Sequence, residues 1–441
     1  MATVRYVFDA EIPVAAECDV LVVGAGPGGV SAAVTAARNG AKVALADLHG
    51  APGGTATFGE ITPMMPNHYS PDGVKEHTHP LDGPLYLDIM KRMNSYLPAP
   101  LRRSEFGSYV GVDYIVDKNL ISLAMEDLCL EAGVKMLYHF RLADVQREGR
   151  RIVRAVFQTK SGLMAVDARN FIDATGDGDL AALAGCAFEF GEKGSGYCQP
   201  MTLCFKLCHV DRDRVDWPAM QAAYKEAQRT GRLHCPRENI LTFRFYDDDV
   251  VHFNTTRVVK KSAVDALERS EAEIEGRRQM REIVDWLRAE IPGFENARYL
   301  SVAAEIGVRE SRRILGRAYL TQEDFVRHAT FPDGILRCNY NIDIHSPVGT
   351  GTSFVRCTLA EFYEIPFGCL LPRDVDNLAV GCRAISVSHE LHASSRVMPP
   401  VCSTGQAAGM AAAMAAKRGI DVSAVDGVEL RGELRNFGAQ L

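Results

Sequence analysis

CDVLVVGAGPGGVSAAVTAARNGAKVALAD, residues 18–47, has the pattern of a strand, a tight turn, a helix and a second strand. The apolar run at 20–23 is typical of a central parallel strand covered on both faces. Three glycines follow with the G-x-G-x-x-G spacing, which allows the turn, a close approach to a pyrophosphate and tight helix packing: Gly24, Gly26 and Gly29. The stretch therefore predicts a dinucleotide site with phosphates at a helix N-terminus.

The second strand of this unit, residues 43–46, ends at Asp47. A carboxylate about 20 residues after the glycines can hold the two ribose hydroxyls. An acid at this place argues against a 2′-phosphate. Two other glycine-rich stretches, GEKGSG at 191 and GTGTSF at 349, do not follow an apolar strand. We therefore expect one dinucleotide.

Length and charge limit the remaining possibilities. A chain of 441 residues is long enough for two or three domains, at roughly 150 residues each. The net charge of −7 gives no basic footprint, so we expect no nucleic-acid partner. The N-terminus lacks a signal-peptide core, and the longest weakly charged run, 20–37, is interrupted by glycines and a proline. These features predict a soluble, cytoplasmic protein without a membrane partner.

The twelve cysteines are spaced singly, and no CxxC pair is present. The spacing of Cys198, Cys204 and Cys208 fits neither a zinc site nor an iron–sulfur cluster. We interpret the cysteines as small buried hydrophobic residues in a reducing cytosol and expect no metal.

Three further motifs accompany the first stretch. They are GAPGGTATFGEITP at 50–63, FIDATGDGDLAALAGC at 171–186 and VSHELHASSRVMPPVCSTGQAAG at 387–409. Together they resemble the FAD-dependent oxidoreductases of the glutathione-reductase-type fold. More closely, they are similar to the family that includes the FAD domain of the heterodisulfide reductase A subunit. The resemblance covers nearly the whole chain, through the segments 308–321, 341–345 and 363–372.

This resemblance implies FAD as the cofactor and a set of residues that hold it. The set is Gly24, Gly26, Gly28, Gly29, Asp47, Gly53, Gly54, Thr55, Thr175, Gly176, Asp177, Arg383, Met398, Thr404, Gly405 and Gln406. The chain departs from the family at Gly381-Cys382-Arg383, where Ala-Gly-Arg is usual. Cys382 therefore puts a side chain where backbone normally lies close to the cofactor.

The expected fold class is α/β, a Rossmann-type FAD-binding domain (glutathione-reductase-like) with an inserted α+β substrate or cap domain. In the first domain we expect a helix at 117–132, a strand at 134–139 and a meander that ends at 171–173. In the cap we interpret the charged helix near 262–290 as a solvated face. The FAD-binding domain comprises 1–57, 116–190 and 366–441, and the cap comprises 58–115 and 191–365.

The last motif predicts a helix with small residues. Ser403 and Gln406 have the spacing of a capping box that starts this helix. Lys417 and Arg418 suit its C-terminal end, and Gly419 is the expected stop. In similar proteins such a helix directs its N-terminus at the flavin pyrimidine ring, where its dipole stabilises the charge of reduction. The alternative is an ordinary packing helix.

Histidines in the same motif suggest a proton acceptor. His389 or His392 can act as the base, and Arg396 can clamp a carboxylate or polarise a carbonyl. Two alternatives stay open: a structural histidine pair, or a metal site, although HELH is one residue short of H-E-x-x-H.

A second polar pair, Asp343 and His345, lies in NIDIH at 341–345. We expect this pair opposite the flavin, with His345 among the catalytic residues. Arg309 and Arg312 offer anion contacts or, alternatively, an ion-pair network with the neighbouring glutamates.

The predicted function is an FAD-dependent dehydrogenase or oxidase that transfers hydride from a small polar substrate to flavin N5. One alternative is a flavin reductase or monooxygenase that uses NAD(P)H. Another is an electron-transfer subunit of a larger complex, which the missing cysteine-rich motif disfavours. A disulfide relay is also disfavoured, because no cysteine pair follows residues 53–54. The expected partner is a small-molecule substrate, with a homo-oligomer or an electron-acceptor protein left open.

Overall fold

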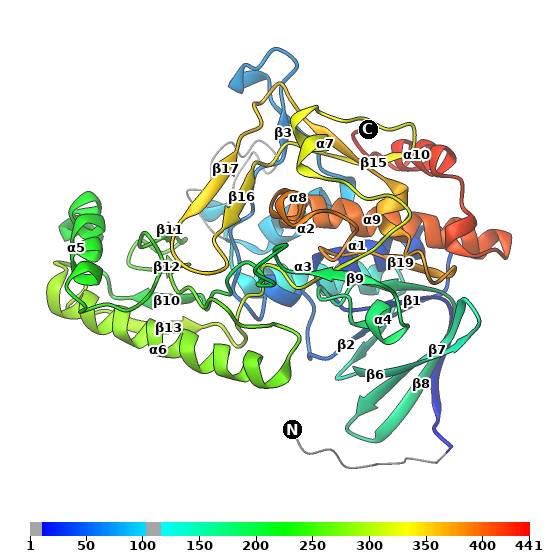
Figure 1. The fold of residues 1–441 in the computed structure, drawn as a ribbon, viewed down its shortest axis with the longest axis horizontal. Coiled ribbons are helices and arrows are strands. Elements are labelled where there is room, and N and C mark those ends of the chain that lie inside the picture. Colours follow the sequence, from blue (N-terminus) through cyan, green and yellow to red (C-terminus); the bar gives the residue numbers. More distant parts are fainter. Residues whose placement is uncertain (1–10, 103–115) are drawn as a thin grey trace.

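A seven-stranded sheet organises the fold (Figure 1). The computed structural model describes residues 11–102 and 116–441. The strand order is β5-β2-β1-β8-β7-β6, and β19 also pairs with β8. The strands are β1 (Val14–Val23), β2 (Val43–Asp47), β5 (Lys135–Tyr138), β6 (Arg141–Glu148), β7 (Arg151–Thr159), β8 (Gly162–Asp173) and β19 (Leu378–Val380). Strands β5, β2, β1, β8 and β19 are parallel, so the predicted dinucleotide-binding sheet is confirmed.

The first βαβ unit forms as its sequence predicts. The end of β1 and all of β2 are buried, as apolar central strands should be. Helix α1 (Pro27–Arg38) begins with a proline at its first position, where the missing N–H costs nothing. Helix α9 (Met398–Arg418) packs along α1, and both helices are almost entirely buried.

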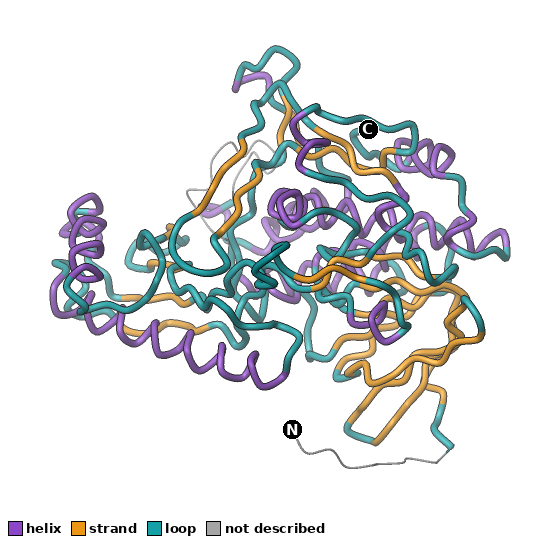
Figure 2. The backbone as a smooth tube through the Cα atoms, viewed as in Figure 1, coloured by secondary structure: helices purple, strands orange, loops and turns teal. Residues whose placement is uncertain are grey.

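The third contribution to the sheet also matches the prediction. Helix α3 (Lys118–Glu131) begins after Asp117, whose side chain accepts from the N–H of Asn119. The meander β6-β7-β8 then follows and ends at Asp173. Figure 2 shows these strands as the long orange hairpins at the lower right.

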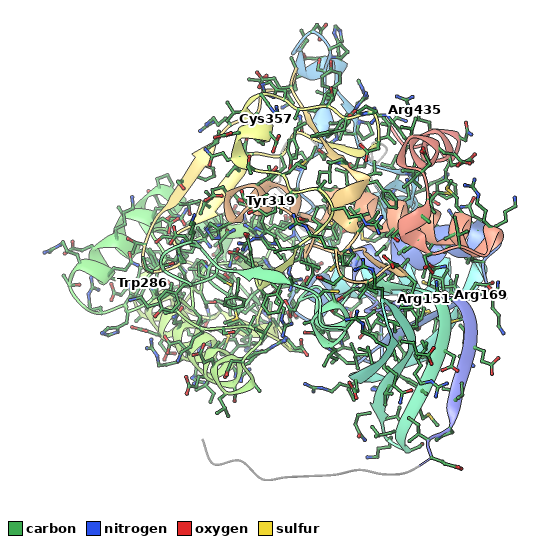
Figure 3. The ribbon with its side chains drawn as sticks, turned by 45° about the vertical axis from the view of Figure 1, so that its right-hand side comes forward. Arg151, Arg169, Trp286, Tyr319, Cys357 and Arg435 are labelled. Atoms are coloured by element: carbon green, nitrogen blue, oxygen red, sulfur yellow. The ribbon has the colours of Figure 1, made fainter. Side chains whose placement is uncertain are left out.

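A second unit lies at the opposite side of the molecule, at the lower left of Figure 1. Its antiparallel sheet has the order β11-β12-β10-β13, flanked by two helices. The elements are β10 (Phe205–Cys208), α5 (Trp217–Arg229), β11 (Thr242–Arg244), β12 (Val251–Phe253), α6 (Ala266–Glu290) and β13 (Arg298–Val302). Its core includes Phe205 and Phe253, stacked with ring centroids 4.7 Å apart. Figure 3 places Trp286 of α6 in this unit, far from Arg151 and Arg169 of the meander.

Helix α6 is only partly the solvated helix that its charges predicted. One face carries ion pairs such as Arg278 with Glu275 and Glu282. The opposite face is buried against the second core, at Ala272, Gly276, Gln279, Met280, Ile283, Val284, Trp286 and Leu287. A 25-residue helix with one apolar stripe is an amphipathic packing element.

Shorter elements complete the fold. Paired strands are β3 (His68–Tyr69) with β4 (His79–Pro80), β9 (Phe188–Phe190) with β14 (Arg312–Ile314), β15 (Gly334–Cys338) with β18 (Tyr363–Pro366), and β16 (Ile342–His345) with β17 (Thr352–Val355). Further helices are α2 (Pro84–Tyr96), α4 (Asp179–Leu183), α7 (Gln322–Val326), α8 (His389–Ser395) and α10 (Gly427–Asn436). No helix in the described ranges is long and apolar enough to cross a membrane.

Two hydrophobic clusters form the cores. The second cluster draws its buried residues from 201–308 alone. The first cluster includes residues of α2 and of the segment 314–371 together with the parallel sheet. The predicted cap of 58–115 and 191–365 stays a prediction. The clusters favour a second unit that spans fewer residues than this cap. Residues 1–10 and 103–115 lie outside the described residues.

The predicted start of the last long helix is wrong. Helix α9 begins at Met398, five positions before Ser403, and Pro399 and Pro400 occupy its first turn. Prolines suit this turn because its N–H groups have no helical partner. Ser403 lies inside the helix, where its hydroxyl donates to the Pro399 carbonyl oxygen and accepts from the N–H of Gly83. The predicted stop at Gly419 is confirmed, with φ +67°.

Candidate active site

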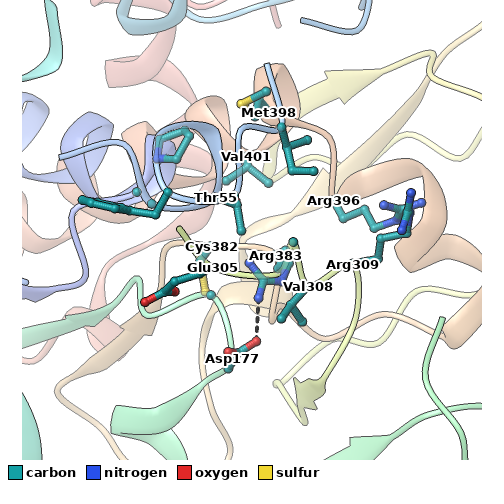
Figure 4. Close-up of a pocket in the computed structure, with 18 of the residues that line it drawn as sticks. Thr55, Asp177, Glu305, Val308, Arg309, Cys382, Arg383, Arg396, Met398 and Val401 are labelled. Carbon is teal, nitrogen blue, oxygen red and sulfur yellow. Dashed lines mark hydrogen bonds and ion pairs between the residues drawn. The ribbon is translucent and has the colours of Figure 1, made fainter. Parts of the chain in front are cut away.

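One cavity of about 1240 Å³ runs between the parallel sheet and the second unit. Its wall includes the glycine turn after β1, the acidic turn after β8, the start of α9 and a polar group from the connecting strands. Figure 4 shows Thr55, Cys382 and Met398 towards one end and Arg309 and Arg396 at the other. The volume exceeds the roughly 300–1,000 Å³ of most small-ligand sites, which suits a dinucleotide together with a substrate.

The glycine turn has the geometry that its spacing predicted. Gly24 has φ +101°, and a Cβ there would lie 2.3 Å from the carbonyl oxygen of Ala174. A Cβ on Gly29 would lie 1.8 Å from the carbonyl oxygen of Gly24, so Gly29 serves helix packing and does not line the cavity. Gly26 has nothing within 4 Å of such a Cβ. Its backbone is therefore open to a phosphate at the N-terminus of α1.

Asp47 ends β2 as predicted and lines the cavity. Its Oδ2 accepts from the N–H of Ala25 at 2.6 Å, which fixes the carboxylate beside the glycine turn. Its Oδ1 contacts Nδ1 of His49 at 2.9 Å, and Nε2 of His49 lies 2.8 Å from Oε1 of Glu305. Although burial opposes the charged imidazole, the hydrogen bonds to Asp47 and Glu305 raise the pKa of His49 to about 9. No sequence motif points to this histidine as a site residue.

The acidic turn after β8 is held by a buried carboxylate. Asp173 accepts from the N–H groups of Thr175 and Ala181 at 3.0 and 2.8 Å. The following residues Thr175, Gly176 and Asp177 line the cavity as predicted. Asp177 accepts from Arg383 at 2.5 Å, the contact drawn in Figure 4.

Cys382 lies in the wall beside that turn. Burial raises the pKa of its thiol to about 12, so the thiol stays protonated. The side chain is a small apolar surface towards the cavity. Gly54 and Thr55 also line the cavity, whereas Gly53, with φ +116°, shapes the turn behind them.

Helix α9 meets the cavity with its first turn only, through Met398 and Val401. Thr404, Gly405 and Gln406 do not line the cavity. Gly405 packs on α1, where a Cβ would lie 1.9 Å from the carbonyl oxygen of Gly28. Gln406 instead accepts from the N–H of Leu85 in α2 at 3.3 Å. Gly405 and Gln406 thus pack against neighbouring helices, and the cofactor contacts of all three residues stay predictions.

His389 and His392 lie behind the cavity wall, on α8, and neither lines it. His389 contacts Oε1 of Glu310 through Nδ1 at 2.9 Å, in a buried group with Arg313. His392 is fully buried, and burial lowers its pKa well below the usual range. This placement favours the structural alternative for the pair.

The other predicted polar residues come together in the cavity: Asp343, His345, Arg309, Arg312 and Arg396. Arg396 donates to Oδ1 of Asp343 at 3.2 Å, and Nε2 of His345 lies 3.9 Å from Oδ2 of Asp343. Arg312 forms an ion pair with Asp179 at 2.7 Å, and not with the neighbouring glutamates that the ion-pair alternative named.

Several wall residues were missed, above all Tyr340, Arg237 and Glu238. The hydroxyl of Tyr340 donates to Oδ2 of Asp343 at 3.4 Å. Arg237 is 5% exposed and comes from the connection between α5 and β11. None of these three residues belongs to a recognisable motif, so only the tertiary structure places them in the site.

One group of described side chains is close enough to share a metal ion: His328, Cys357 and Glu361. None of them lines the cavity. The histidines of HELH do not take part in this group.

The residues at the end of the cavity beside the glycine turn fit FAD. An open glycine backbone at Gly26, a helix N-terminus and the carboxylate of Asp47 are the groups that hold an adenosine pyrophosphate. The first turn of α9 stands beside the same cavity, where its dipole favours negative charge.

The chain is similar to solved structures at low sequence identity and with TM-scores below 0.5. A geranylgeranyl bacteriochlorophyll reductase-like protein from Thermoplasma acidophilum is 12% identical, with 95% of this chain and 82% of that chain covered and a TM-score of 0.46. A flavin-dependent brominase is 13% identical, with 95% of this chain and 84% of that chain covered and a TM-score of 0.47. The p-nitrophenol 4-monooxygenase of Pseudomonas putida DLL-E4 is 9% identical, with 96% of this chain and 87% of that chain covered and a TM-score of 0.45. No curated protein matches the sequence.

The sequence matches the family of FAD-dependent oxidoreductases over residues 19–434, which is nearly its whole length. The matched region includes the glycine turn, Asp47 and the first turn of α9. This chain therefore belongs to the FAD-dependent oxidoreductase family and is an enzyme with FAD as its cofactor.

Proposed function

We propose that this enzyme is a dehydrogenase or oxidase of a small polar substrate, with His345 as the proton acceptor. One observation carries the proposal: His345, Asp343 and Arg396 share one cavity with the FAD-binding turn. Bound FAD supplies the two-electron acceptor for a hydride from the substrate carbon. The hydroxyl or amine on that carbon must lose its proton in the same oxidation, and a side chain in the cavity has to receive it.

The hydrogen bonds around His345 support this role. The hydroxyl of Thr352 donates to Oε1 of Glu238 at 2.7 Å, and Nδ1 of His345 lies 2.9 Å from the same hydroxyl oxygen. A carboxylate only accepts, so the hydroxyl proton of Thr352 lies in the hydrogen bond to Glu238. Nδ1 of His345 must therefore carry a proton and donate it to the hydroxyl oxygen of Thr352. The lone pair of the imidazole is then on Nε2, the nitrogen near Asp343. Glu238 and Thr352 are thus positioning residues for a neutral imidazole with a free Nε2.

The charge around His345 keeps the imidazole neutral. Burial, together with the guanidinium groups of Arg309 and Arg396, lowers its pKa far below the usual range. Asp343 is also affected, since burial raises the pKa of its carboxyl although Arg396 and Arg309 oppose this. A neutral imidazole accepts the proton, and the adjacent Asp343 stabilises the imidazolium that forms.

The test is anaerobic reduction of the purified protein with hydroxy acids, amines and sugars, followed by the loss of flavin absorbance. With an active donor, His345→Gln should keep its FAD and lose roughly 10²–10⁴-fold in reduction rate. Thr352→Val should lose less, and its rate should be restored in part by Thr352→Ser, because only the hydroxyl fixes the tautomer. His234→Gln, an exposed histidine paired with Glu282, is the matched control and should behave as the wild type.

Two outcomes contradict this proposal. Loss of flavin reduction in His389→Gln, with a normal rate in His345→Gln, would place the base on α8. Rapid reduction by NADH or NADPH, with no response to any other donor, would favour the flavin reductase or monooxygenase alternative.

The closer relationship to the heterodisulfide reductase A subunit is part of the same proposal. It is supported by the order of the motifs along the chain, from the glycine turn at 24–29 to the last motif at 387–409. The absence of a CxxC pair in the sequence supports an enzyme that completes its reaction without an iron–sulfur relay of its own.

A further inference from the structure

The polar end of the cavity holds more positive than negative charge. Arg237 and Arg309 line it, and within the described ranges neither guanidinium forms an ion pair. The other charges nearby are matched: Arg396 pairs with Asp343, and Arg257 pairs with Glu238. The unmatched surplus is therefore carried by Arg237 and Arg309.

Neutral oxygen atoms hold these two guanidinium groups in place. Arg309 donates to the carbonyl oxygen of Pro200 at 2.8 Å, to the hydroxyl of Thr202 and to Oδ1 of Asn254 at 3.3 Å. The Nε of Arg237 donates to Oδ1 of Asn239 at 3.1 Å. Such contacts fix the orientation of a guanidinium without neutralising it. Both are therefore built into the wall and are not surface side chains that happen to face it.

Keeping these charges together is unfavourable unless an anion joins them. Burial lowers the pKa of Arg309 to about 9, and the neighbouring Arg237 and Arg396 act in the same direction. Charges removed from water need a partner of opposite sign, and two unmatched cations need a dianion.

We propose that the substrate is a small dicarboxylic acid with a hydroxyl or amino group on the carbon that is oxidised, and that its two carboxylates bind Arg237 and Arg309. This proposal rests on the proposed function, because it names the substrate class of the same site. The planar guanidinium fork matches a carboxylate with two parallel hydrogen bonds, and two separate forks match two carboxylates. Arg396, shared with Asp343, borders the bound acid.

A bound dianion also acts on the proposed base. The arginines that depress the basicity of His345 are Arg309, Arg396, Arg237 and Arg257. Carboxylates on Arg237 and Arg309 offset part of this positive field, so His345 becomes a better proton acceptor when the acid is bound. A neutral molecule of the same shape leaves the imidazole in its weakly basic state.

The first experiment measures binding to the oxidised FAD-loaded enzyme, through changes in flavin absorbance and by calorimetry. The probes are succinate and malonate, with butyrate, 1,4-butanediol and inorganic phosphate for comparison. We expect succinate or malonate to bind at least tenfold more tightly than butyrate, and butanediol not to bind. Arg237→Gln and Arg309→Gln should each weaken dicarboxylate binding at least tenfold while FAD content stays normal.

Arg229→Gln is the matched control, since it removes an arginine of α5 that is exposed and paired with Glu226. It should bind succinate as the wild type does. If the two pocket variants lose FAD, Arg237→Lys and Arg309→Lys replace them; these keep the charge without the fork, and an intermediate loss of affinity is expected.

The outcomes separate this inference from the proposed function. Binding of phosphate but not of dicarboxylates, or equal affinity in Arg229→Gln, Arg237→Gln and Arg309→Gln, overturns the dicarboxylate inference. Flavin reduction by neutral donors only also overturns it and leaves the proposed function intact. Dicarboxylate binding without flavin reduction by any donor supports the anion site and contradicts the proposed oxidation.

Discussion

His49 stands between two carboxylates, Asp47 and Glu305, and its pKa is raised to about 9. A group whose pKa is raised on folding contributes stability that is fully present below its ordinary value of 6.5 and is lost as the pH rises through 9. His49→Gln should therefore lower the free energy of unfolding by about 1–2 kcal/mol at pH 6, a value reduced for partial exposure. Urea titrations at pH 6, 8 and 10 measure this difference.

The loss caused by His49→Gln should shrink between pH 7 and pH 10. A difference that stays constant over this range would show that packing on Phe58, which stacks on the imidazole at 3.8 Å, and not charge, is what His49 contributes.

The sequence alone places residues in the cavity wall where one contiguous motif contains them, while their contacts with FAD stay predictions. Gly24, Gly26 and Asp47 are such residues, because their spacing alone fixes their relation to the phosphates. The chemistry of His389 and His392 and their place in a motif suggest a base, but both are buried on α8, and neither lines the cavity. Sequence position does not reveal which side of a short helix faces a ligand.

At the scale of elements, helices α1 and α9 cross in close contact. A Cβ on Gly405 would lie 1.9 Å from the carbonyl oxygen of Gly28, and one on Gly409 would lie 2.2 Å from that of Ala32. Both neighbours are backbone atoms and cannot move aside as a side chain would. The two glycines set the distance between the helices and hence the position of the glycine turn.

Gly405→Ala should therefore cost at least about 3 kcal/mol, the upper part of the range for overpacked cores. FAD should be lost more easily as well, because Gly28 lines the cavity. Thermal unfolding and retention of FAD on gel filtration are the measurements. Gly432→Ala in α10 is the control, where no atom lies within 4 Å, and it should be neutral or stabilising by up to about 1 kcal/mol. Equal melting temperatures for the two variants would contradict this.

Elements were predictable where periodicity and capping agree, as in α1, α3 and β2. The start of α9 was mispredicted because two signals compete there. Ser403 and Gln406 have the spacing of a cap, but the prolines at 399 and 400 already form the first turn. Ser403 is buried and accepts from the N–H of Gly83, a tertiary contact that its spacing in the sequence does not reveal.

At the scale of the whole molecule, Glu60 connects the two units. This fully buried carboxylate accepts from Lys118 at the start of α3 at 2.5 Å. It also accepts from Lys206 of β10 and Ser301 of β13, both at 2.8 Å. The side chain of Glu60 thus joins helix α3, which packs on the parallel sheet, to the sheet of the second unit.

Glu60→Gln should weaken the link, since it leaves the buried Lys206 without a carboxylate, at a cost of about 3–5 kcal/mol. Both tryptophans, Trp217 and Trp286, lie in the second unit, whereas FAD reports on the first. We expect tryptophan fluorescence to change at a lower temperature than flavin release in this variant, and together in the wild type. Glu271→Gln, which breaks an exposed pair with Lys261, should leave the two transitions coincident. Coincident transitions in Glu60→Gln would show that other contacts couple the units.

The unmatched arginines of the cavity lie in a chain whose net charge is −7. Fields of opposite sign therefore act on an approaching dianion at different ranges, repulsive outside and attractive within. Mobile ions damp the two unequally, because the Debye length falls from about 30 Å at 0.01 M to about 8 Å at 0.15 M ionic strength. Added salt removes the long-range repulsion first and reaches the enclosed attraction last. A dianion consequently enters fastest at an intermediate ionic strength, and very dilute buffer slows its entry.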